Sequence, residues 1–299
     1  MRSARGAASI CAPFTHVESP TLKTYIQMDR TRRELHGLCG ALVAGVLLTV
    51  VTADTAVAQR RGAPRAAAAE SAQAAAPMDI TGHWVALITD DWVYRMITPA
   101  KGDYSYLPLN AEGRRVADTW DSARDSAAGE ECKGYAAPAI MRLPSRMHIT
   151  WQDPNTLKLD IDTGMQTRLF RFGQPEPQGP RTWQGWSTAE WEISGNTDRQ
   201  MVFGDAVTSL GEVPKQGSLK VDTTNLRAGY LRKNGVPFSE DAFMTEYYNL
   251  ITEEDGNQYI VIQTYVEDPR YLRAHFVRSM QFKREPDGSK RNPQPCSAT

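Results

Sequence analysis

Histidine and cysteine are scarce in this chain, which limits the chemistry that its sequence can encode. The 299 residues include five histidines and four cysteines. Three of the histidines, His83, His148 and His275, lie beyond residue 77, and no two have the H-x-x-x-H spacing of a zinc-binding helix. We therefore predict no metal site and expect these imidazoles to make ordinary hydrogen bonds.

The sequence also lacks the motifs of several large enzyme classes. It has no G-x-S-x-G nucleophile elbow, no phosphate-binding loop and no dinucleotide fingerprint. Excess positive charge is missing too: from Met78 onward Lys+Arg is 34 − 9 = 25 and Asp+Glu is 35 − 5 = 30, a net charge of about −5. We predict no cofactor, and no nucleic-acid partner because such binding depends on neutralising phosphates.

Tryptophan is absent from residues 1–77, and all seven tryptophans follow. Large aromatic side chains bury large apolar areas, so the packed core is expected after residue 77. A basic stretch (30–33), an apolar run of 14 residues (38–51) and a small-x-small pattern (56–58) instead form the three parts of a secretory signal. The run is shorter than the roughly 20 residues that a membrane span needs.

This composition predicts three parts of the chain. Residues 1–58 are expected to be a leader with an export signal, in which Met28 is the favoured start of translation, and an uncleaved anchor is the alternative. The Ala-rich segment 59–77 is interpreted as a linker, and 78–299 as a single domain. We expect a periplasmic or secreted protein without a stable membrane span after signal cleavage.

One pair of cysteines, Cys132 and Cys296, lies in the predicted mature part. An exported chain meets an oxidising compartment in which such a pair can join. We predict a disulfide that holds the C-terminal tail to the body of the domain, and two free thiols are the alternative.

Alternation of apolar and polar residues predicts strands through most of the domain. In 156–162, for example, Leu157, Leu159 and Ile161 share one face, and turn residues follow. Eleven segments show this pattern, and from them we expect roughly nine or ten short strands. The expected strands are 79–89, 91–98, 146–151, 156–162, 166–172, 182–193, 199–204, 217–226, 241–251, 257–267 and 274–285.

One segment departs from this period. Residues 109–131 space their apolar side chains three and four apart, with Asn110 as a plausible N-cap, which predicts one α-helix near 110–127. Residues 230–237 are interpreted as a turn-like connection. A mainly β fold is therefore expected: an antiparallel up-and-down barrel of about 8–10 strands, since closure removes unpaired edges.

Gly82 and Trp84, two apart on the first expected strand, resemble the opening motif of the lipocalin family and its calycin relatives. The resemblance implies that the glycine lets the chain bend closely and that the tryptophan plugs one end of the barrel. It also implies a basic side chain over the indole, for which Arg278 is the chosen candidate beside Arg273 and Lys283. The early helix departs from the usual lipocalin, so the chain is more similar to loosely defined lipocalin-like exported bacterial proteins.

Two side chains are weak candidates for acid–base catalysis. Glu246 lies in an otherwise apolar strand and shares a face with Tyr248, so burial in the barrel would raise its pKa; exposure to water is the alternative. His148 is the second candidate. The carboxylates of Asp160 and Asp162, close to Lys158 and Arg168, are interpreted as part of a solvated outer face.

The segment 90–106 concentrates aromatic and cationic residues. This mixture suits a ligand with a ring or a carboxylate at the mouth of a barrel, and rim packing of a long loop is the alternative. The candidate ligand-binding residues are Trp92, Tyr94, Arg95 and Tyr248.

Three functions remain open from the sequence. The first is an exported lipocalin-like protein that binds a small hydrophobic or aromatic ligand in a barrel cavity. The second is a cofactor-free enzyme of the isomerase, hydratase or cyclase type that uses the same cavity, with Glu246 or His148 as acid or base. The third is a structural envelope protein whose barrel is filled by side chains.

Overall fold

The computed structural model describes residues 70–175, 177–194, 200–203, 206–209 and 216–299. All that follows concerns the compact unit Ala66–Thr299. The export signal, the start at Met28 and most of the expected linker lie outside the described residues and stay predictions.

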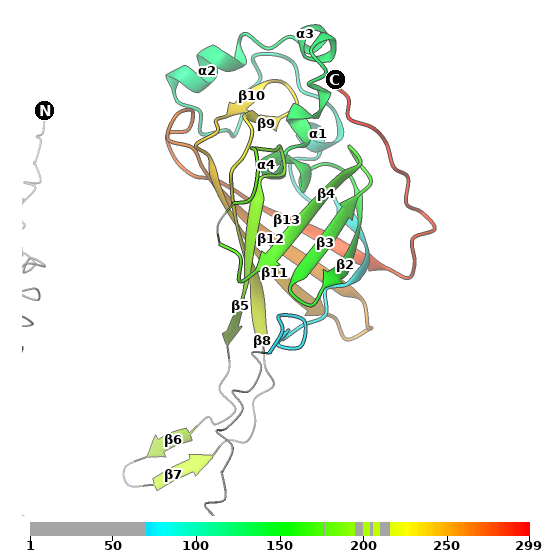
Figure 1. Ribbon diagram of the computed structural model, residues 1–299, viewed down its shortest axis with the longest axis vertical. Coiled ribbons are helices and arrows are strands. Elements are labelled where there is room, and N and C mark those ends of the chain that lie inside the picture. The colour runs from blue at the N-terminus through cyan, green and yellow to red at the C-terminus, as the bar shows by residue number, and fades with distance from the viewer. Residues whose placement is uncertain (1–69, 176, 195–199, 204–205, 210–215) are drawn as a thin grey trace, which may run out of the picture. The chain divides into compact units, whose positions relative to one another are not determined.

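Nine strands form a closed barrel within this unit (Figure 1). Their order around the barrel is β1-β13-β12-β11-β8-β5-β4-β3-β2, and β2 pairs with β1 to close the ring. The strands are β1 (Gly82–Leu87), β2 (Arg146–Asp153), β3 (Thr156–Ile161), β4 (Gln166–Phe172), β5 (Trp186–Ser194), β8 (Gln216–Thr224), β11 (Phe243–Thr252), β12 (Gln258–Glu267) and β13 (Phe276–Glu285).

The barrel is mixed, not strictly antiparallel as we expected. Eight of its nine neighbouring pairs are antiparallel, whereas β4 and β5 run parallel. The reason is the connection 173–185, which is too long for a hairpin and returns along the barrel before β5 begins.

Strand alternation fills the inside of the barrel. Leu157, Leu159 and Ile161, which share a face in the sequence, are at most 1% exposed. Met147, Ile149, Phe170, Leu219, Val221, Ile260, Ile262, Met280 and Phe282 join them in one buried cluster. Each such side chain contributes roughly 1.5–3 kcal/mol on burial, so this cluster holds the barrel together.

Trp84 lies at the end of the barrel where β1 begins, which we call the base. It is fully buried, and its indole Nε1 donates to the carbonyl oxygen of Ile80 at 3.0 Å. The turn near 71–75, part of the expected linker, packs at the same end, where Gln73 N donates to Pro154 O and Trp191 Nε1 to Ala72 O.

The guanidinium over Trp84 is that of Arg284, 4.4 Å from the ring centroid, and not that of Arg278. Arg284 is the direct register partner of Trp84 on β13, and it donates to the carbonyl oxygens of Thr81 and Asp79. Arg278 shares the parity of Arg284 but lies six residues earlier, roughly 20 Å along the strand.

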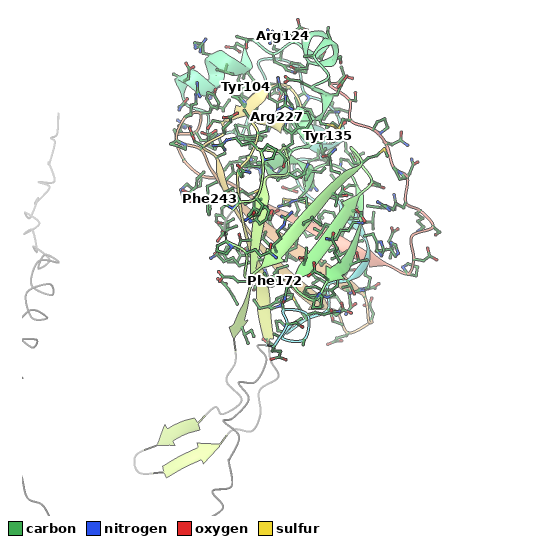
Figure 2. The ribbon with its side chains drawn as sticks, in the orientation of Figure 1. Tyr104, Arg124, Tyr135, Phe172, Arg227 and Phe243 are labelled. Carbon is green, nitrogen blue, oxygen red and sulfur yellow. A yellow bond between two sulfur atoms is a disulfide. The ribbon has the colours of Figure 1, made fainter. Side chains whose placement is uncertain are left out.

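The opposite end, which we call the mouth, is covered by short helices and a hairpin. Figure 2 shows Tyr104, Tyr135 and Arg227 in this cap and Phe172 on the barrel. A second buried cluster, with Leu109, Phe238 and Phe276 among its members, lies there. The elements are α1 (Trp92–Met96), α2 (Ala111–Ala117), α3 (Ser122–Ala127), η1 (Glu131–Tyr135), α4 (Ala137–Ile140), β9 (Gly229–Arg232) and β10 (Val236–Phe238).

Three expectations for this region were wrong. The expected strand 91–98 is α1, because Asp91 adopts a left-handed conformation (φ 46°) that ends the extended chain. The expected single helix 110–127 is two helices, α2 and α3, since the side chain of Asp121 accepts from the N–H groups of Ala123 and Arg124 and starts a new helix there. The connection 230–237 contains the strand pair β9–β10.

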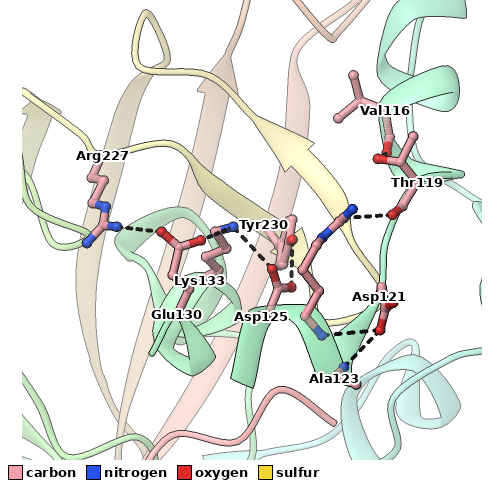
Figure 3. A network of polar contacts seen from close by, with 10 residues as sticks. Val116, Thr119, Asp121, Ala123, Asp125, Glu130, Lys133, Arg227 and Tyr230 are labelled. Carbon is pink, nitrogen blue, oxygen red and sulfur yellow. Dashed lines mark hydrogen bonds and ion pairs between the residues drawn. The ribbon is translucent and has the colours of Figure 1, made fainter. Parts of the chain in front are cut away.

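A polar network ties the cap together (Figure 3). Glu130 accepts from Arg227 at 2.7 Å and pairs with Lys133. Lys133 also reaches the buried Asp125, which accepts a hydrogen bond of 2.8 Å from the hydroxyl of Tyr230. The pKa of Glu130 is held below its usual value mainly by the hydrogen bond from Lys133. The network joins α3 and η1 to β9.

Cys132 and Cys296 form a disulfide, as we predicted, with their Cα atoms 5.1 Å apart. It fixes the C-terminal tail to η1. Further contacts follow the tail, since Gln294 N donates to Asp162 O and Ser297 N donates to the hydroxyl of Tyr135. The remaining described pair of strands is β6 (Gln200–Phe203) with β7 (Ala206–Ser209), where the sequence predicted a strand at 199–204.

Candidate ligand pocket at the barrel mouth

Glu246 lies inside the barrel, where it forms a two-pronged ion pair with Arg168. Arg168 Nη2 lies 2.6 Å from Oε2 and Nη1 lies 3.1 Å from Oε1, and both side chains are 0% exposed. Burial opposes the charge of Arg168, but the Glu246 carboxylate outweighs it and raises the pKa of the guanidinium. We interpreted Asp160 and Asp162, with Arg168 beside them, as a solvated outer face. This was wrong for Asp162 and Arg168, which are 4% and 1% exposed, and strand alternation turns Arg168 inward.

Tyr248 belongs to the same buried network. Its hydroxyl lies 3.3 Å from Glu246, and its ring meets Phe170 edge-on with centroids 5.4 Å apart. Burial, followed by the Glu246 charge, raises the pKa of this phenol well above its usual value. The structure therefore places this candidate ligand-binding residue in the barrel core, where it supports Glu246.

His148 lies elsewhere, on the partly exposed outer face of β2. Its ring stacks on that of His83 with centroids 4.1 Å apart and an angle of 9°. Burial, and then the neighbouring His83, lowers the pKa of His148. The two acid–base candidates of the sequence, Glu246 and His148, are thus on opposite faces of the barrel wall and form no common site.

A pocket of about 140 Å³ opens at the mouth. Of the candidate ligand-binding residues from the sequence, Tyr94 and Arg95 line it, whereas Trp92 is not among its lining residues and is 67% exposed. The side chains that share the pocket with them are chiefly Tyr135, Arg142, Arg232 and Lys233, with Met96, Ile97 and Leu143 as the apolar part. The pocket therefore joins aromatic, apolar and cationic groups.

Two arginines in this pocket keep unused donors. Arg95 donates from Nη1 to Asp90 and from Nε to the carbonyl of Arg142, and Arg142 donates from Nη2 to Asp91. Among the described residues, the buried atoms Arg95 Nη2 and Arg142 Nη1 have no hydrogen-bond partner. A buried donor without a partner is costly, so an acceptor brought within reach of either nitrogen would be stabilising.

Arg232 adds a third guanidinium. It stacks on the ring of Tyr94 at 4.4 Å and donates to the carbonyls of Asp103 and Ser105. Burial, followed by the nearby charge of Arg142, lowers its pKa to about 10. Burial also lowers the pKa of Arg95, against the attraction of Asp90. Three guanidinium groups thus lie close together in the pocket, and a bound anion would reduce the repulsion between them.

Tyr94 and Arg95 were candidate residues from the sequence, whereas Arg142 and Arg232, which line the same pocket, were not. These two come from a loop after α4 and from β9, which the chain brings together only when the cap forms. The Asn234-Gly235 turn signalled a connection at this point, but no local pattern says which end of the barrel it reaches.

Within the described ranges, no group of three or more His, Cys, Asp or Glu side chains is arranged to hold a metal ion. In that same part of the chain, none of the helices is both long and apolar enough to cross a bilayer. No protein-family model, curated protein or solved structure matches this chain. The closed nine-stranded barrel is compatible with a calycin-like fold.

Proposed function

We propose that this chain is an exported, lipocalin-like binding protein whose ligand is a small organic anion. The carrying observation is the pair of buried, unpartnered donors, Arg95 Nη2 and Arg142 Nη1, on residues that line one pocket. A carboxylate accepts from two guanidinium groups at once, and such charge-assisted hydrogen bonds are the strong ones.

The remaining pocket walls limit the rest of the ligand. Tyr94 and Tyr135 offer ring faces, and Leu143 offers apolar contact. The volume of about 140 Å³ is close to that of a cavity of roughly 150 Å³ that takes up benzene. A single aromatic or short aliphatic acid therefore fits this proposal better than a long-chain lipid.

We place the ligand at the mouth and not in the barrel interior. Inner side chains such as Phe170, Ile262 and Tyr248 are fully buried against one another. Export is supported by the disulfide between Cys132 and Cys296, because such bonds persist in oxidising compartments.

Calorimetric titration with benzoate tests the proposal, with benzamide as an uncharged ligand of the same shape. We expect the compact unit 66–299 to bind benzoate in preference to benzamide, since only the carboxylate satisfies both arginines. Arg142→Met should weaken benzoate binding by about tenfold or more, the loss of one charge-assisted hydrogen bond.

Arg146→Met is the matched control, because Arg146 lies on the barrel wall at the start of β2 and pairs with Glu285. Native mass spectrometry of the exported protein provides an independent check, since a co-purifying acid of small mass would identify the natural ligand. Equal affinity for benzoate and benzamide, or equal loss in both variants, would refute the anion site.

A further inference from the structure

The short helix α1 exposes its apolar face and buries its charge. Trp92 and Met96, and likewise Val93 and Ile97, are four residues apart and so form two adjacent rows on one face. They are 67%, 56%, 38% and 62% exposed. Between them the side chain of Arg95 is 0% exposed. A surface helix normally has the reverse arrangement, so this outward face needs a partner.

The apolar surface continues past α1 to Tyr106, which is 74% exposed. The ring of Tyr94 links the two, since it meets Tyr106 edge-on with centroids 6.2 Å apart. The backbone is left-handed at Asp91 (φ 46°) and at Tyr106 (φ 63°), one at each end of the segment. Non-glycine residues occupy this region at a cost and cluster at functional sites.

Cationic side chains flank this surface. A groove beside Tyr106 is lined by Arg114, Arg273 and Arg278, and Asp103 is its one acidic lining residue within the described ranges. Arg278 is also paired with Asp91, with Nε 3.5 Å from Oδ2, so Arg114 and Arg273 supply the positive charge that stays exposed. Arg114 and Arg273 are exposed. The chain from Met78 onward is net acidic, 25 − 30 = −5, so this local excess of arginine runs against the overall charge and favours an anionic partner.

We propose that this surface, which consists of Trp92, Val93, Met96, Ile97 and Tyr106 with the flanking arginines, docks on a membrane that carries anionic lipid. Exposed tryptophan and tyrosine insert at the level of the lipid headgroups, and arginine pairs with lipid phosphates beside them. The charge pattern disfavours a second copy of this chain, because a two-fold contact would bring the same arginine-flanked patch from both copies into one interface.

The docking surface adjoins the ligand pocket, since Met96 and Ile97 belong to both. A docked protein would therefore hold the pocket entrance against the membrane surface. The docking proposal does not rest on the proposed anion ligand. It is argued from exposed apolar and cationic side chains, whereas the ligand site is argued from buried hydrogen-bond donors.

Vesicle co-sedimentation tests the docking, with the compact unit 66–299, whose barrel closes without earlier residues. The vesicles are phosphatidylcholine alone and phosphatidylcholine mixed with phosphatidylglycerol. We expect binding to the mixed vesicles, weakened by added salt. The double variant Trp92→Ser/Ile97→Ser should bind about tenfold more weakly or worse.

The matched control is Phe243→Ser/Ile251→Ser, which removes two exposed apolar side chains from β11 (36% and 43% exposed). It should bind like the wild type. Circular dichroism and thermal melts of both variants check the fold. Failure of the wild type to bind either vesicle, or equal loss in both double variants, overturns the proposal, and so does a dimer in gel filtration that Trp92→Ser/Ile97→Ser dissolves. The vesicle assay contains no benzoate, and Trp92→Ser/Ile97→Ser leaves Arg95 and Arg142 in place, which separates this test from that of the ligand.

Discussion

The buried ion pair between Arg168 and Glu246 affects the stability of the fold. Both side chains are 0% exposed and meet through two hydrogen bonds. We predict that Glu246→Gln lowers the free energy of unfolding by about 3–5 kcal/mol, because it leaves a guanidinium buried without a counter-charge. Arg168→Met/Glu246→Leu should recover much of that loss. Urea unfolding at neutral pH measures both.

A surface pair provides the comparison for that experiment. Lys220 and Glu190 lie 2.8 Å apart on the outer face, where Glu190 is 61% exposed. Glu190→Gln should cost at most about 1 kcal/mol, because solvent screens the pair. If Glu246→Gln were as mild as Glu190→Gln, water would have to reach the barrel interior.

The stacked imidazoles of His83 and His148 predict a pH dependence. The pKa of His148 is lowered in the folded protein, first by burial and then by His83 and Arg291, so below about pH 6.5 the unfolded chain binds more protons than the folded one. Stability should therefore be constant above that pH and fall as the pH drops through it towards the lower folded pKa. Thermal melts between pH 8 and pH 5 should show this, and His148→Gln should flatten the profile.

Sequence reasoning succeeded for residues whose role is set by their own strand. Trp84 is buried at one end of the barrel as the glycine–tryptophan motif implied. The choice of Arg278 was wrong and Arg284 was not among the candidates, because the alternation of side chains along β13 can be inferred from the sequence, whereas the register of β13 against β1 cannot. The inward position of Arg168 was not predicted for a related reason, because its carboxylate partner Glu246 is 78 residues away in the sequence.

Among elements, the C-terminal tail depends most clearly on one covalent link. The disulfide joins residues 164 apart in sequence, so it closes a long loop in the unfolded chain. We predict that Cys132→Ser/Cys296→Ser lowers the free energy of unfolding by about 2–5 kcal/mol. Urea unfolding of the wild type with reductant should then match the variant without it. A wild type indifferent to reductant would show that the tail is held by its hydrogen bonds alone.

Elements were predictable where a regular period runs without interruption. Strands β2, β3 and β12 match their expected ranges closely because the inner face of each is almost entirely apolar, with Thr264 as the buried polar residue of β12. The cap was not predictable in the same way. A helical period spans 110–127, but Asp121 offers its carboxylate to two backbone N–H groups and so divides the segment.

For the whole molecule, sequence reasoning predicted a barrel and aromatic and cationic residues at its mouth, but not the full set of residues that line the pocket there. The sequence predicts apolar inner faces for most strands, and these side chains fill the interior of the barrel. The pocket instead arises where Tyr94 and Arg95 meet Arg142 and Arg232, which lie in separate parts of the chain. That meeting depends on the covering of the mouth by the helices and by β9–β10, a long-range arrangement that no local pattern encodes.

The parallel pairing of β4 and β5 follows from the odd number of strands in the closed barrel. A ring in which every neighbour points the opposite way needs an even number of members, so nine strands force one mismatch. That seam has three residue pairs in register, 170–172 with 187–189, against ten between β11 and β12. The guanidinium of Arg171 on β4 stacks over the ring of Trp186 on β5, 3.9 Å from its centroid, and so spans this parallel pair. Amide protons bonded across it should exchange with deuterium sooner than those between β11 and β12, and equal protection would mean that side chains such as Arg171 close the ring as firmly as its backbone.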